Sequence, residues 1–464
     1  MSTQTIETDY FVVGCGASGM AFTDALVSDS DAQVVMVDRR HALGGHWLEA
    51  YPFVRLHQPS AYYGVNSLPL GDETIDIHGP NRGMYERASA PEICAYYQRV
   101  MDKRLLPTGR VRYFPMCEVV GRHRFVSRLS GERYEVKVRK KWVDAAYLQP
   151  AIPATYPPPF EIAPGARCVP VGELVRVAER ADGYVIIGAG KTAVDACLWL
   201  LQTGVPPEAI TWIKPREAWF INRAFAQGGE LVGTMFEGIS LQVEAAARAT
   251  SFDDLFARLS AAEQLLRVDT RVTPTMFKGA TMSVGEVEEL RRIDKVVRLG
   301  KIRRIERDTI LLEQGTLPTS PRHLHVHCAA PGLNPAPGVP IFTEDRVTLQ
   351  SIRTGLVPFN AALIGFVEAT REDTAAKNRL CPPNALPDTT LDWVRGTLTS
   401  MQADNLWSKE PDLSDWLERA RLNPSRGLRQ HGGEPRVQQA RKRFLEHVRP
   451  GLARLEQLLA QARA

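Results

Sequence analysis

The sequence predicts an α/β fold of two Rossmann-like dinucleotide-binding domains, the second inserted in the first, plus a helical C-terminal region. Two glycine-rich turns carry this prediction: Gly14–Gly19 and Gly188–Ala193, about 170 residues apart, both read Gly-x-Gly-x-x-Gly/Ala. Each follows an apolar run typical of a buried parallel strand and opens a helix-like stretch. The backbone N–H groups of such a unit hold a pyrophosphate at the helix N-terminus. Two units in one chain indicate two nucleotides and electron transfer between them.

The residues after the first turn supply the expected ribose contact. A second apolar run, Val34–Val37, ends in Asp38, nineteen residues beyond Gly19. An acid at this place accepts hydrogen bonds from a ribose. The alternative is an accidental glycine turn in an ordinary α/β domain. The residues predicted to contact the first nucleotide here are Gly14, Gly16, Ala17, Ser18, Gly19, Asp38 and Arg39.

The second turn is followed by cations instead of an acid. After Thr211–Ile213 the sequence continues with Lys214 and Arg216, and no carboxylate stands at the predicted strand end. Cations there suit a ribose 2′-phosphate, which favours NADPH over NADH. A surface pair of basic residues is the alternative. The residues predicted to contact this nucleotide are Gly188, Gly190, Lys191, Thr192, Lys214 and Arg216.

The composition is that of an ordinary globular protein. The chain has 464 residues, 44% hydrophobic and 24% charged, with a net charge of +4, which argues against a dedicated nucleic-acid binder. No apolar run approaches the roughly 20 residues of a membrane span, and the N-terminus lacks a signal-peptide pattern, so we expect a cytoplasmic protein. The seven cysteines show no Cys-x-x-Cys pair and the ten histidines no metal-ligand spacing, which indicates reduced thiols and no metal.

Two proline-rich stretches, 150–160 and 329–338, divide the chain. We read them as crossovers, so that the first nucleotide domain comprises 1–150 and 329–380 and the second comprises 151–328. Within the first, Ser89–Glu92 is a capping box that opens a helix to about Met101, and Tyr134–Val138 alternates like a strand.

Two regions lie outside the nucleotide units. An insert at about 230–290 has helical patterning and either lies over the cleft between the domains or is a plain surface excursion. The C-terminal region, 381–464, holds two predicted helices, at 437–448 and 452–459, separated by Pro450. Their basic side is most simply a solvated face. A contact between subunits of a homo-oligomer is the alternative.

The ordered motifs of the chain resemble those of class B flavin monooxygenases, the group of flavin-containing, Baeyer–Villiger and N-hydroxylating monooxygenases. The resemblance covers 8–225 and returns near 325–370. Besides the two glycine turns and Asp38, it includes the more specific segment Gly44-Gly45-x-Trp47 followed by Tyr51-Pro52. It implies FAD on the first turn, with Gly45, His46 and Trp47 along the cofactor, and NADPH on the second.

The resemblance also suggests where the chemistry occurs. His57 falls where relatives place an Asn or Asp beside the reactive face of the flavin, and an imidazole there would hydrogen-bond a flavin peroxide. A structural histidine bonded to backbone is the alternative. Arg55 and Gln58 are the weaker catalytic candidates, and Arg55 alternatively pairs with an acid. Tyr62 and Tyr63 either line the pocket or belong to the core.

The segment 359–368 resembles the last flavin-domain strand and a helix start whose N–H groups face the isoalloxazine carbonyl. Such a helix N-terminus stabilises the reduced flavin anion. Asn360 lies in this segment, and Gln350 is close enough in sequence to reach the ring. Both are therefore predicted cofactor contacts.

The sequence also departs from the family pattern. The fingerprint Phe-x-Gly-x-x-x-His is missing, and 160–171 occupies its place without the histidine. The usual Ala-Thr-Gly turn is replaced by Asp144–Leu148. These departures bear on oxygen insertion more than on nucleotide binding.

The sequence is therefore interpreted as an FAD-dependent, NADPH-consuming monooxygenase that acts on a small organic substrate and O₂ through a C4a-peroxyflavin. One alternative is an NADPH-dependent flavoprotein reductase or oxidase that inserts no oxygen. A second is a non-catalytic flavin-fold binding module. The cofactors would supply the difficult chemistry, while the protein orients them and excludes water.

Overall fold

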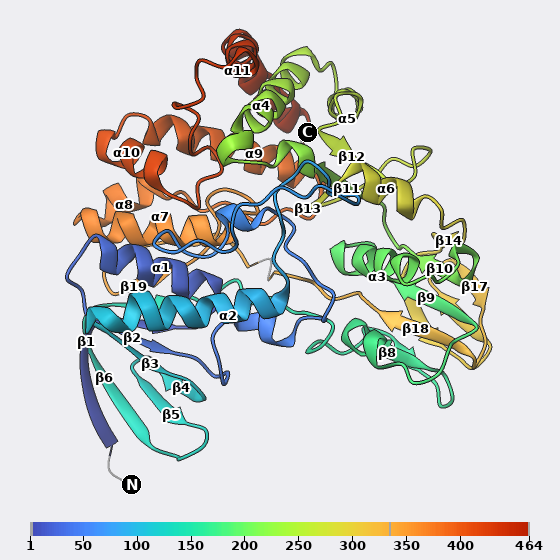
Figure 1. Cartoon of the computed structure of the whole chain (residues 1–464), viewed down its shortest axis with the longest axis horizontal. Coiled ribbons are helices and arrows are strands. Elements are labelled where there is room, and N and C mark those ends of the chain that lie inside the picture. The colour runs from blue at the N-terminus through green and yellow to red at the C-terminus, as the bar shows by residue number, and fades with distance from the viewer. Residues whose placement is uncertain (1–2, 334–335, 463–464) are drawn as a thin grey trace.

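The computed structural model describes residues 3–333 and 336–462. The predicted connector 329–338 lies partly outside the described residues, as do the start of the domain predicted from residue 1 and the end of the region predicted to residue 464. Two sheets stand at opposite ends of the molecule, and in the first the strands β4, β5 and β6 pair antiparallel while the other pairs are parallel (Figure 1). The first has seven strands in the order β3-β2-β1-β6-β5-β4, with β19 pairing β6. Its strands are β1 (Thr3–Val13), β2 (Val34–Val37), β3 (Val111–Phe114), β4 (Cys117–Gly121), β5 (Arg124–Ser127), β6 (Arg133–Asp144) and β19 (Arg346–Thr348).

Two helices of the first unit approach each other closely. Helices α1 (Ala17–Ser28) and α7 (Val357–Thr370) lie side by side (Figure 1). Gly365 of α7 makes their close approach feasible, because a Cβ there would lie 2.6 Å from the carbonyl oxygen of Phe22. Helix α2 (Ala90–Val100) begins at the predicted capping box, with Ser89 as N-cap. That prediction is confirmed, as is the strand predicted at 134–138, which lies within β6.

The second sheet has five parallel strands in the order β14-β10-β9-β18-β8. They are β8 (Cys168–Pro170), β9 (Gly183–Ile187), β10 (Ile210–Ile213), β14 (Val296–Val297) and β18 (His323–His327). Helices α3 (Lys191–Gln202) and α6 (Val284–Leu290) pack on it. The chain leaves the first sheet after β6 and returns to it at β19, so the second unit is inserted in the first. The predicted fold class is confirmed.

Two smaller sheets accompany the second unit. One has the order β17-β16-β15-β7 and the other β12-β11-β13. Their strands are β7 (Glu161–Ile162), β11 (Ala218–Asn222), β12 (Leu265–Leu266), β13 (Met276–Met282), β15 (Ile302–Ile305), β16 (Thr309–Leu312) and β17 (Gly315–Pro318). The insert contains the expected helices, α4 (Val232–Arg248) and α5 (Phe252–Ala261), but β12 and β13 show that it is not purely helical.

The C-terminal helices are not one separate layer. Helices α8 (Thr374–Leu380), α9 (Thr390–Trp407) and α10 (Pro411–Arg419) extend the core of the first unit, where Trp407 and Trp416 pack on Phe359. Helix α11 (Pro435–Gln461) instead lies along α4 at the top of the molecule (Figure 1). Among the described helices, none has the length and apolar character that crossing a membrane requires.

The predicted break of the last helix at Pro450 is wrong. Helix α11 runs through Pro450 without interruption. A proline removes one backbone hydrogen bond and costs helix stability of about 3 kcal/mol. Packing against α4 overrides this local preference, because Val437, Ala440, Leu455 and Leu458 are buried along the same helix.

Candidate cofactor site and catalytic cavity

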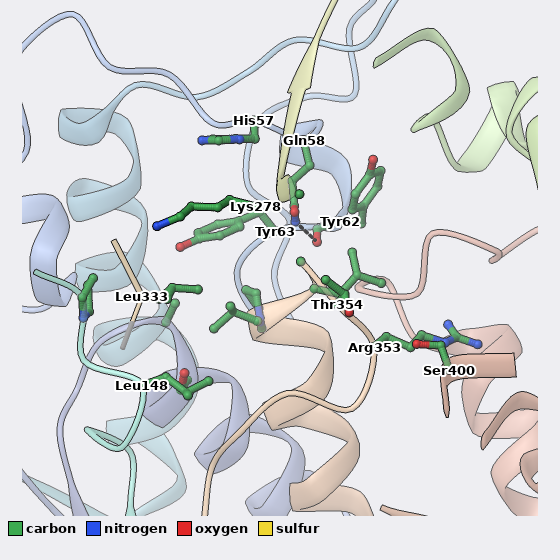
Figure 2. Close-up of a pocket in the computed structure, with 18 of the residues that line it drawn as sticks. His57, Gln58, Tyr62, Tyr63, Leu148, Lys278, Leu333, Arg353, Thr354 and Ser400 are labelled. Carbon is green, nitrogen blue, oxygen red and sulfur yellow. Dashed lines mark hydrogen bonds between the residues drawn. The ribbon is translucent and has the colours of Figure 1, made fainter. Parts of the chain in front are cut away.

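A cavity of about 820 Å³ begins at the first glycine turn and ends between α4, α9 and α11. Along the way it is lined by the segments 45–47, 56–58, 62–63, 145–150 and 353–358. Figure 2 shows part of this lining, with His57, Gln58, Tyr62 and Tyr63 on one side and the loop at Arg353 on another. The cavity therefore joins the predicted dinucleotide site to side chains from the far end of the chain.

The first glycine turn leaves its helix N-terminus open to this cavity. Gly14 has φ +103°, and a Cβ on Gly19 would lie 2.0 Å from the carbonyl oxygen of Gly14, so neither position accepts a side chain without strain. No side chain caps α1 at Gly16. Gly16, Ala17 and Ser18 line the cavity, and the N–H groups of this first turn are suited to an anion such as a pyrophosphate.

Asp38 stands at the end of β2 and lines the same cavity. One carboxylate oxygen accepts the N–H of Cys15 at 2.7 Å, and the other accepts the N–H of Arg40 at 2.9 Å. These bonds fix the carboxylate in place. Each oxygen retains a further lone pair for a ribose hydroxyl. Arg39, predicted beside it, lines the cavity as an exposed residue.

The segment after the second apolar run forms a further wall. Gly45, His46 and Trp47 lie in η1 (Gly45–Glu49) and line the cavity. A Cβ on Gly45 would come within 3.0 Å of the Cα of Gly16, so the two glycines allow the two segments to touch. The indole N–H of Trp47 donates to the hydroxyl of Tyr63 at 2.7 Å. Burial, together with nearby Arg40, lowers the pKa of His46 to about 4, so its imidazole is neutral at pH 7.

His57 lines the same cavity, on the side of Gln58 (Figure 2). Its carbonyl oxygen accepts the Nε–H of Arg223 at 3.1 Å and the hydroxyl of Thr281 at 2.5 Å. Backbone bonds thus hold the residue, while the side chain lines the cavity. Burial and the charges of Lys191, Arg223 and Arg87 lower the pKa of His57 well below its ordinary value. A neutral imidazole carries one N–H donor and one acceptor.

A buried ion cluster behind His57 connects the two nucleotide units. The guanidinium of Arg223 is fully buried and pairs with Glu286 at 2.9 Å, and Arg87 pairs with the other oxygen of Glu286 at 3.1 Å. Burial would raise the pKa of Glu286, but the two arginines and Lys191 hold it below its ordinary value. The carboxylate therefore stays ionised and fixes Arg223, which in turn positions the backbone of His57.

The segment 359–368 lies wholly within helix α7, so the strand expected in its first part is wrong, and the helix starts two residues before the segment. Helix α7 begins at Val357, and the cavity is lined by the segment 353–358 that leads into it. The side chain of Asn360 is not free for a cofactor, because its amide exchanges hydrogen bonds with the N–H and carbonyl of Arg353, at 2.9 and 2.8 Å. Asn360 therefore shapes the loop, and the prediction that it contacts the cofactor is corrected.

Two further predictions are corrected in the same way. The amide of Gln350 exchanges hydrogen bonds with the backbone of Val339, at 3.2 and 2.7 Å, and lies outside the cavity lining. Arg55 is exposed, donates to the carbonyl of Arg87 at 2.8 Å and faces a separate polar cavity. Of the three catalytic candidates, only His57 and Gln58 line the main cavity, with the amide of Gln58 3.4 Å from the carbonyl of Tyr62.

The second glycine turn has the expected backbone but different side-chain partners. Gly188 has φ +135°, and a Cβ on Gly190 would meet nothing within 4 Å, so the turn is open on the side where a nucleotide would approach. Helix α3 begins directly after it without a side-chain cap. The side chain of Lys191 pairs with Asp195, one turn further along α3. Asp195 also accepts a hydrogen bond from the hydroxyl of Tyr51 at 2.6 Å. Thr192, the residue after Lys191 in α3, is half-buried.

The cations expected to bind a 2′-phosphate both have carboxylate partners. Lys214 is almost fully buried, pairs with Glu217 and lies over the ring of Trp212. Glu217 also pairs with Arg298 at 2.7 Å. Lys214 is therefore a core residue, and its predicted nucleotide contact is corrected.

Arg216 remains accessible but is not free. It makes two bonds to Asp388, at 2.8 and 2.9 Å, and its side chain is 40% exposed. Nucleotide contact by Arg216 therefore stays a prediction, as do the contacts of Gly188, Gly190, Lys191 and Thr192.

The insert at about 230–290 contributes α4 to the inner end of the cavity, so it is not a plain surface excursion, whereas sequence reasoning missed α9 and α11. The lining residues there belong to α4, α9 and α11, which are separated from the glycine turn by more than 200 residues. It also missed Lys278 of β13, which lines the cavity and donates to the carbonyl of Pro331 at 3.1 Å. The apolar stripe of α4 was a detectable signal, but nothing local says which surface such a stripe faces.

Comparison with curated proteins identifies close relatives. The uncharacterised protein Rv2000 of Mycobacterium tuberculosis is 50% identical over 421 residues, which cover 90% of this chain and 78% of the relative. The uncharacterised protein Mb2023 of Mycobacterium bovis matches to the same extent. No protein-family model matches the sequence. The chain belongs to the family of these mycobacterial proteins.

Solved structures share the fold at low sequence identity. The polycyclic ketone monooxygenase of the fungus Thermothelomyces thermophila has a TM-score of 0.52 and 12% identity, with 96% of this chain and 90% of that chain covered. A flavin monooxygenase of Stenotrophomonas maltophilia has a TM-score of 0.47 and 15% identity, with 81% and 99% covered. The chain therefore shares the fold of the first of these structures, a monooxygenase, as its motifs predicted.

Proposed function

We propose that this member of the Rv2000 family is an FAD-dependent, NADPH-consuming monooxygenase of a small organic substrate. One observation carries the proposal: a single cavity runs from the first glycine turn, past His57, to an inner end lined largely by apolar side chains. A dinucleotide bound at the turn would thus extend toward a compartment with room for a second reactant. Ligand sites are typically concave, mostly apolar and equipped with a few placed polar groups.

The residues at the turn fit FAD. The uncapped start of α1 offers N–H groups to a pyrophosphate, and no side chain at Gly14 or Gly16 obstructs its approach. Asp38 keeps lone pairs for a ribose. The N-terminus of α7 at Val357 faces the same cavity and favours negative charge. Bound FAD would accept a hydride from NADPH and pass the electrons to O₂.

The second turn supports a second dinucleotide, which we take to be NADPH. Its glycines leave the N-terminus of α3 open to a pyrophosphate, as at the first turn. Lys191 and Asp195 at the start of α3 connect this helix to Tyr51 of the first unit. The second nucleotide would therefore bind close to the first unit, at the contact of Asp195 with Tyr51.

The protein's own contribution would be to exclude water and to place a hydrogen-bond donor. Tyr62 and Tyr63 are buried and close the cavity beside His57. The neutral imidazole of His57 can donate one hydrogen bond without adding a charge to the compartment. Preorganised donors of this type act most strongly in a site closed to water.

The reaction is balanced as substrate plus NADPH, H⁺ and O₂ giving the oxygenated substrate, NADP⁺ and water. The test is to purify the protein, record its flavin spectrum and screen neutral carbonyl and sulfide compounds for faster NADPH-dependent O₂ uptake. Mass analysis of products formed under ¹⁸O₂ then detects insertion. We expect a yellow protein with one releasable FAD per chain and one labelled oxygen atom per turnover.

Two outcomes would contradict the proposal. NADPH oxidation that yields hydrogen peroxide alone with every compound would identify a reductase or oxidase. A colourless protein, or a yellow one that NADPH does not bleach, would identify a non-catalytic flavin fold.

A further inference from the structure

We propose that the inner end of the cavity is a substrate chamber built by α4, α9 and α11, and that it selects neutral, mainly hydrocarbon molecules. The inference rests on the proposed function in one respect only, namely that the ligand is a substrate. That the chamber exists and selects by polarity is argued from the lining itself.

Two helices present equivalent faces to the chamber. From α4 the lining residues are Met235, Ile239, Gln242, Val243 and Ala246. From α9 they are Trp393, Thr397, Ser400, Met401 and Asp404. Both sets follow the spacing i, i+4, i+7, i+8 and i+11, which is one face of an α-helix. Each helix therefore directs a continuous stripe, rather than isolated side chains, at the cavity.

The C-terminal helix closes the chamber on a third side. Gly451, Leu452 and Leu455 of α11 line the cavity. A Cβ on Gly451 would lie 2.8 Å from the carbonyl oxygen of Val243, so α11 and α4 meet almost backbone to backbone at this glycine. The helix whose basic side the sequence predicts to be a solvated face thus forms part of the chamber wall through these other residues.

The side chains of the chamber wall disfavour the binding of charged ligands. Asp404 is the one charged residue among the described lining residues of α4, α9 and α11, and it is bonded to Arg353 at 2.9 Å. The amides of Gln242 and Gln264 bond each other at 3.2 Å, and the hydroxyl of Ser400 accepts an N–H of Asn384 at 3.3 Å. A charged ligand would lose its hydration without gaining an ion pair.

The lining beyond these helices is apolar as well. Leu255 of α5 and Phe277 of β13 complete it, with 1% and 0% of their surface exposed. Lys278, the next residue along β13, lies toward Tyr63 and away from Ser400 (Figure 2). The inner end thus offers mainly hydrocarbon contacts, and apart from the paired carboxylate of α9 the polar side chains that this helix adds there, Thr397 and Ser400, are uncharged.

Binding to the oxidised, FAD-loaded protein tests the chamber without catalysis. Isothermal titration calorimetry with 2-hexanone, 2-octanone and 2-decanone should show binding about fourfold tighter per added methylene, the value for burying one CH₂ group. Octanoate and octylamine should bind at least tenfold more weakly than 2-octanone. Affinity that does not rise with chain length, or a charged chain that binds as well as the ketone, would overturn the proposal.

A pair of variants locates the site. Ile239→Trp fills the chamber from α4 and should weaken 2-decanone binding at least tenfold. Leu445→Trp makes a matched change on α11 at a residue that is 64% exposed and outside the cavity, and should leave binding unchanged. Should Ile239→Trp not fold, Leu452→Ala at a half-buried position replaces it, with about fourfold weaker binding expected. Equal effects of chamber and control variants would overturn the assignment.

The failure of this inference and the failure of the proposed function can be told apart. If chain length and the variants act as expected but no compound is oxygenated, the chamber stands and the monooxygenase assignment falls. If NADPH bleaches the flavin and oxygen is inserted, yet ketone binding ignores Ile239→Trp, the chamber is overturned and the enzyme assignment stands.

Discussion

The two glycine turns have nearly the same backbone and different surroundings. Each ends a buried parallel strand, each has a glycine with positive φ, and each opens an uncapped helix. The first turn faces a cavity of about 820 Å³, and its acid, Asp38, is bonded only to backbone N–H groups. Around the second, Lys191, Lys214 and Arg216 are each paired with a carboxylate.

The comparison shows that the group that binds a pyrophosphate at a turn differs from the groups that select which nucleotide carries it. Backbone N–H groups at either turn suit any pyrophosphate, since they are set by local conformation. Selection between nucleotides depends on side chains, and a side chain already paired within the protein contributes less to a ligand. We therefore expect changes at the first turn to abolish flavin binding, and changes around the second to act in smaller and separable ways.

Gly16→Val should have the largest effect. A Cβ at Gly16 would lie 3.4 Å from the Cα of Gly45, and the valine methyl groups would occupy the approach of the pyrophosphate. We expect a folded protein without flavin and without NADPH oxidation. The measurement is the ratio of flavin to protein absorbance after gel filtration. Full flavin occupancy would show that the first turn is not the FAD site.

Gly190→Val is the matched change at the second turn. A Cβ there meets nothing within 4 Å, so the protein should fold normally and keep its flavin. Anaerobic reduction by NADPH should slow at least a hundredfold, whereas dithionite should still reduce the flavin. Stopped-flow spectroscopy at 450 nm measures both rates. An unchanged rate with NADPH would remove the second nucleotide from this turn.

His57→Ala tests the residue of the main cavity that we propose as a hydrogen-bond donor. Anaerobic reduction should remain nearly unchanged, because hydride transfer precedes the reaction with oxygen. A lost donor of this kind costs about 2.7–4 kcal/mol, so oxygenated product should fall about a hundredfold while hydrogen peroxide rises. Arg55→Ala is the control, because Arg55 faces a different cavity. Slower reduction with intact coupling would place His57 on the nicotinamide side or in the scaffold.

Lys214→Met should act on stability rather than on cofactor choice. Removing one partner of a buried ion pair typically costs about 3–5 kcal/mol. We expect the free energy of unfolding to fall by about 3 kcal/mol, since Glu217 keeps Arg298 as a partner. Urea denaturation measures the loss. The ratio of the KM values for NADPH and NADH should not change, and a selective rise for NADPH would restore Lys214 to the nucleotide site.

Arg216→Gln should give the smallest and most selective effect. If its exposed guanidinium contacts a 2′-phosphate, losing one charge-assisted bond of about 1.5 kcal/mol raises the KM for NADPH about tenfold. The KM for NADH should be unaffected. Steady-state kinetics with both nucleotides provide the test. Equal changes for the two would show that Arg216 only holds Asp388.

The sequence by itself determined the features that depend on neighbouring residues. The two turns, the strands before them, the capping box at Ser89 and the position of Asp38 could all be predicted, and the inserted topology followed from the order of the motifs. Glycine at a positive φ and a capping side chain are local requirements, so they are visible in a short window of sequence.

Tertiary structure alone decided which side chains are available to a ligand. Glu217 stands three residues after Lys214, but the sequence does not show that the pair is buried, nor that Val339 and Arg353 engage Gln350 and Asn360. Nor does a local pattern place Met235, Trp393 and Gly451 around one cavity, because these residues meet only after long stretches of chain have folded back. Packing also overrode Pro450, since burial along α11 outweighs one missing backbone hydrogen bond.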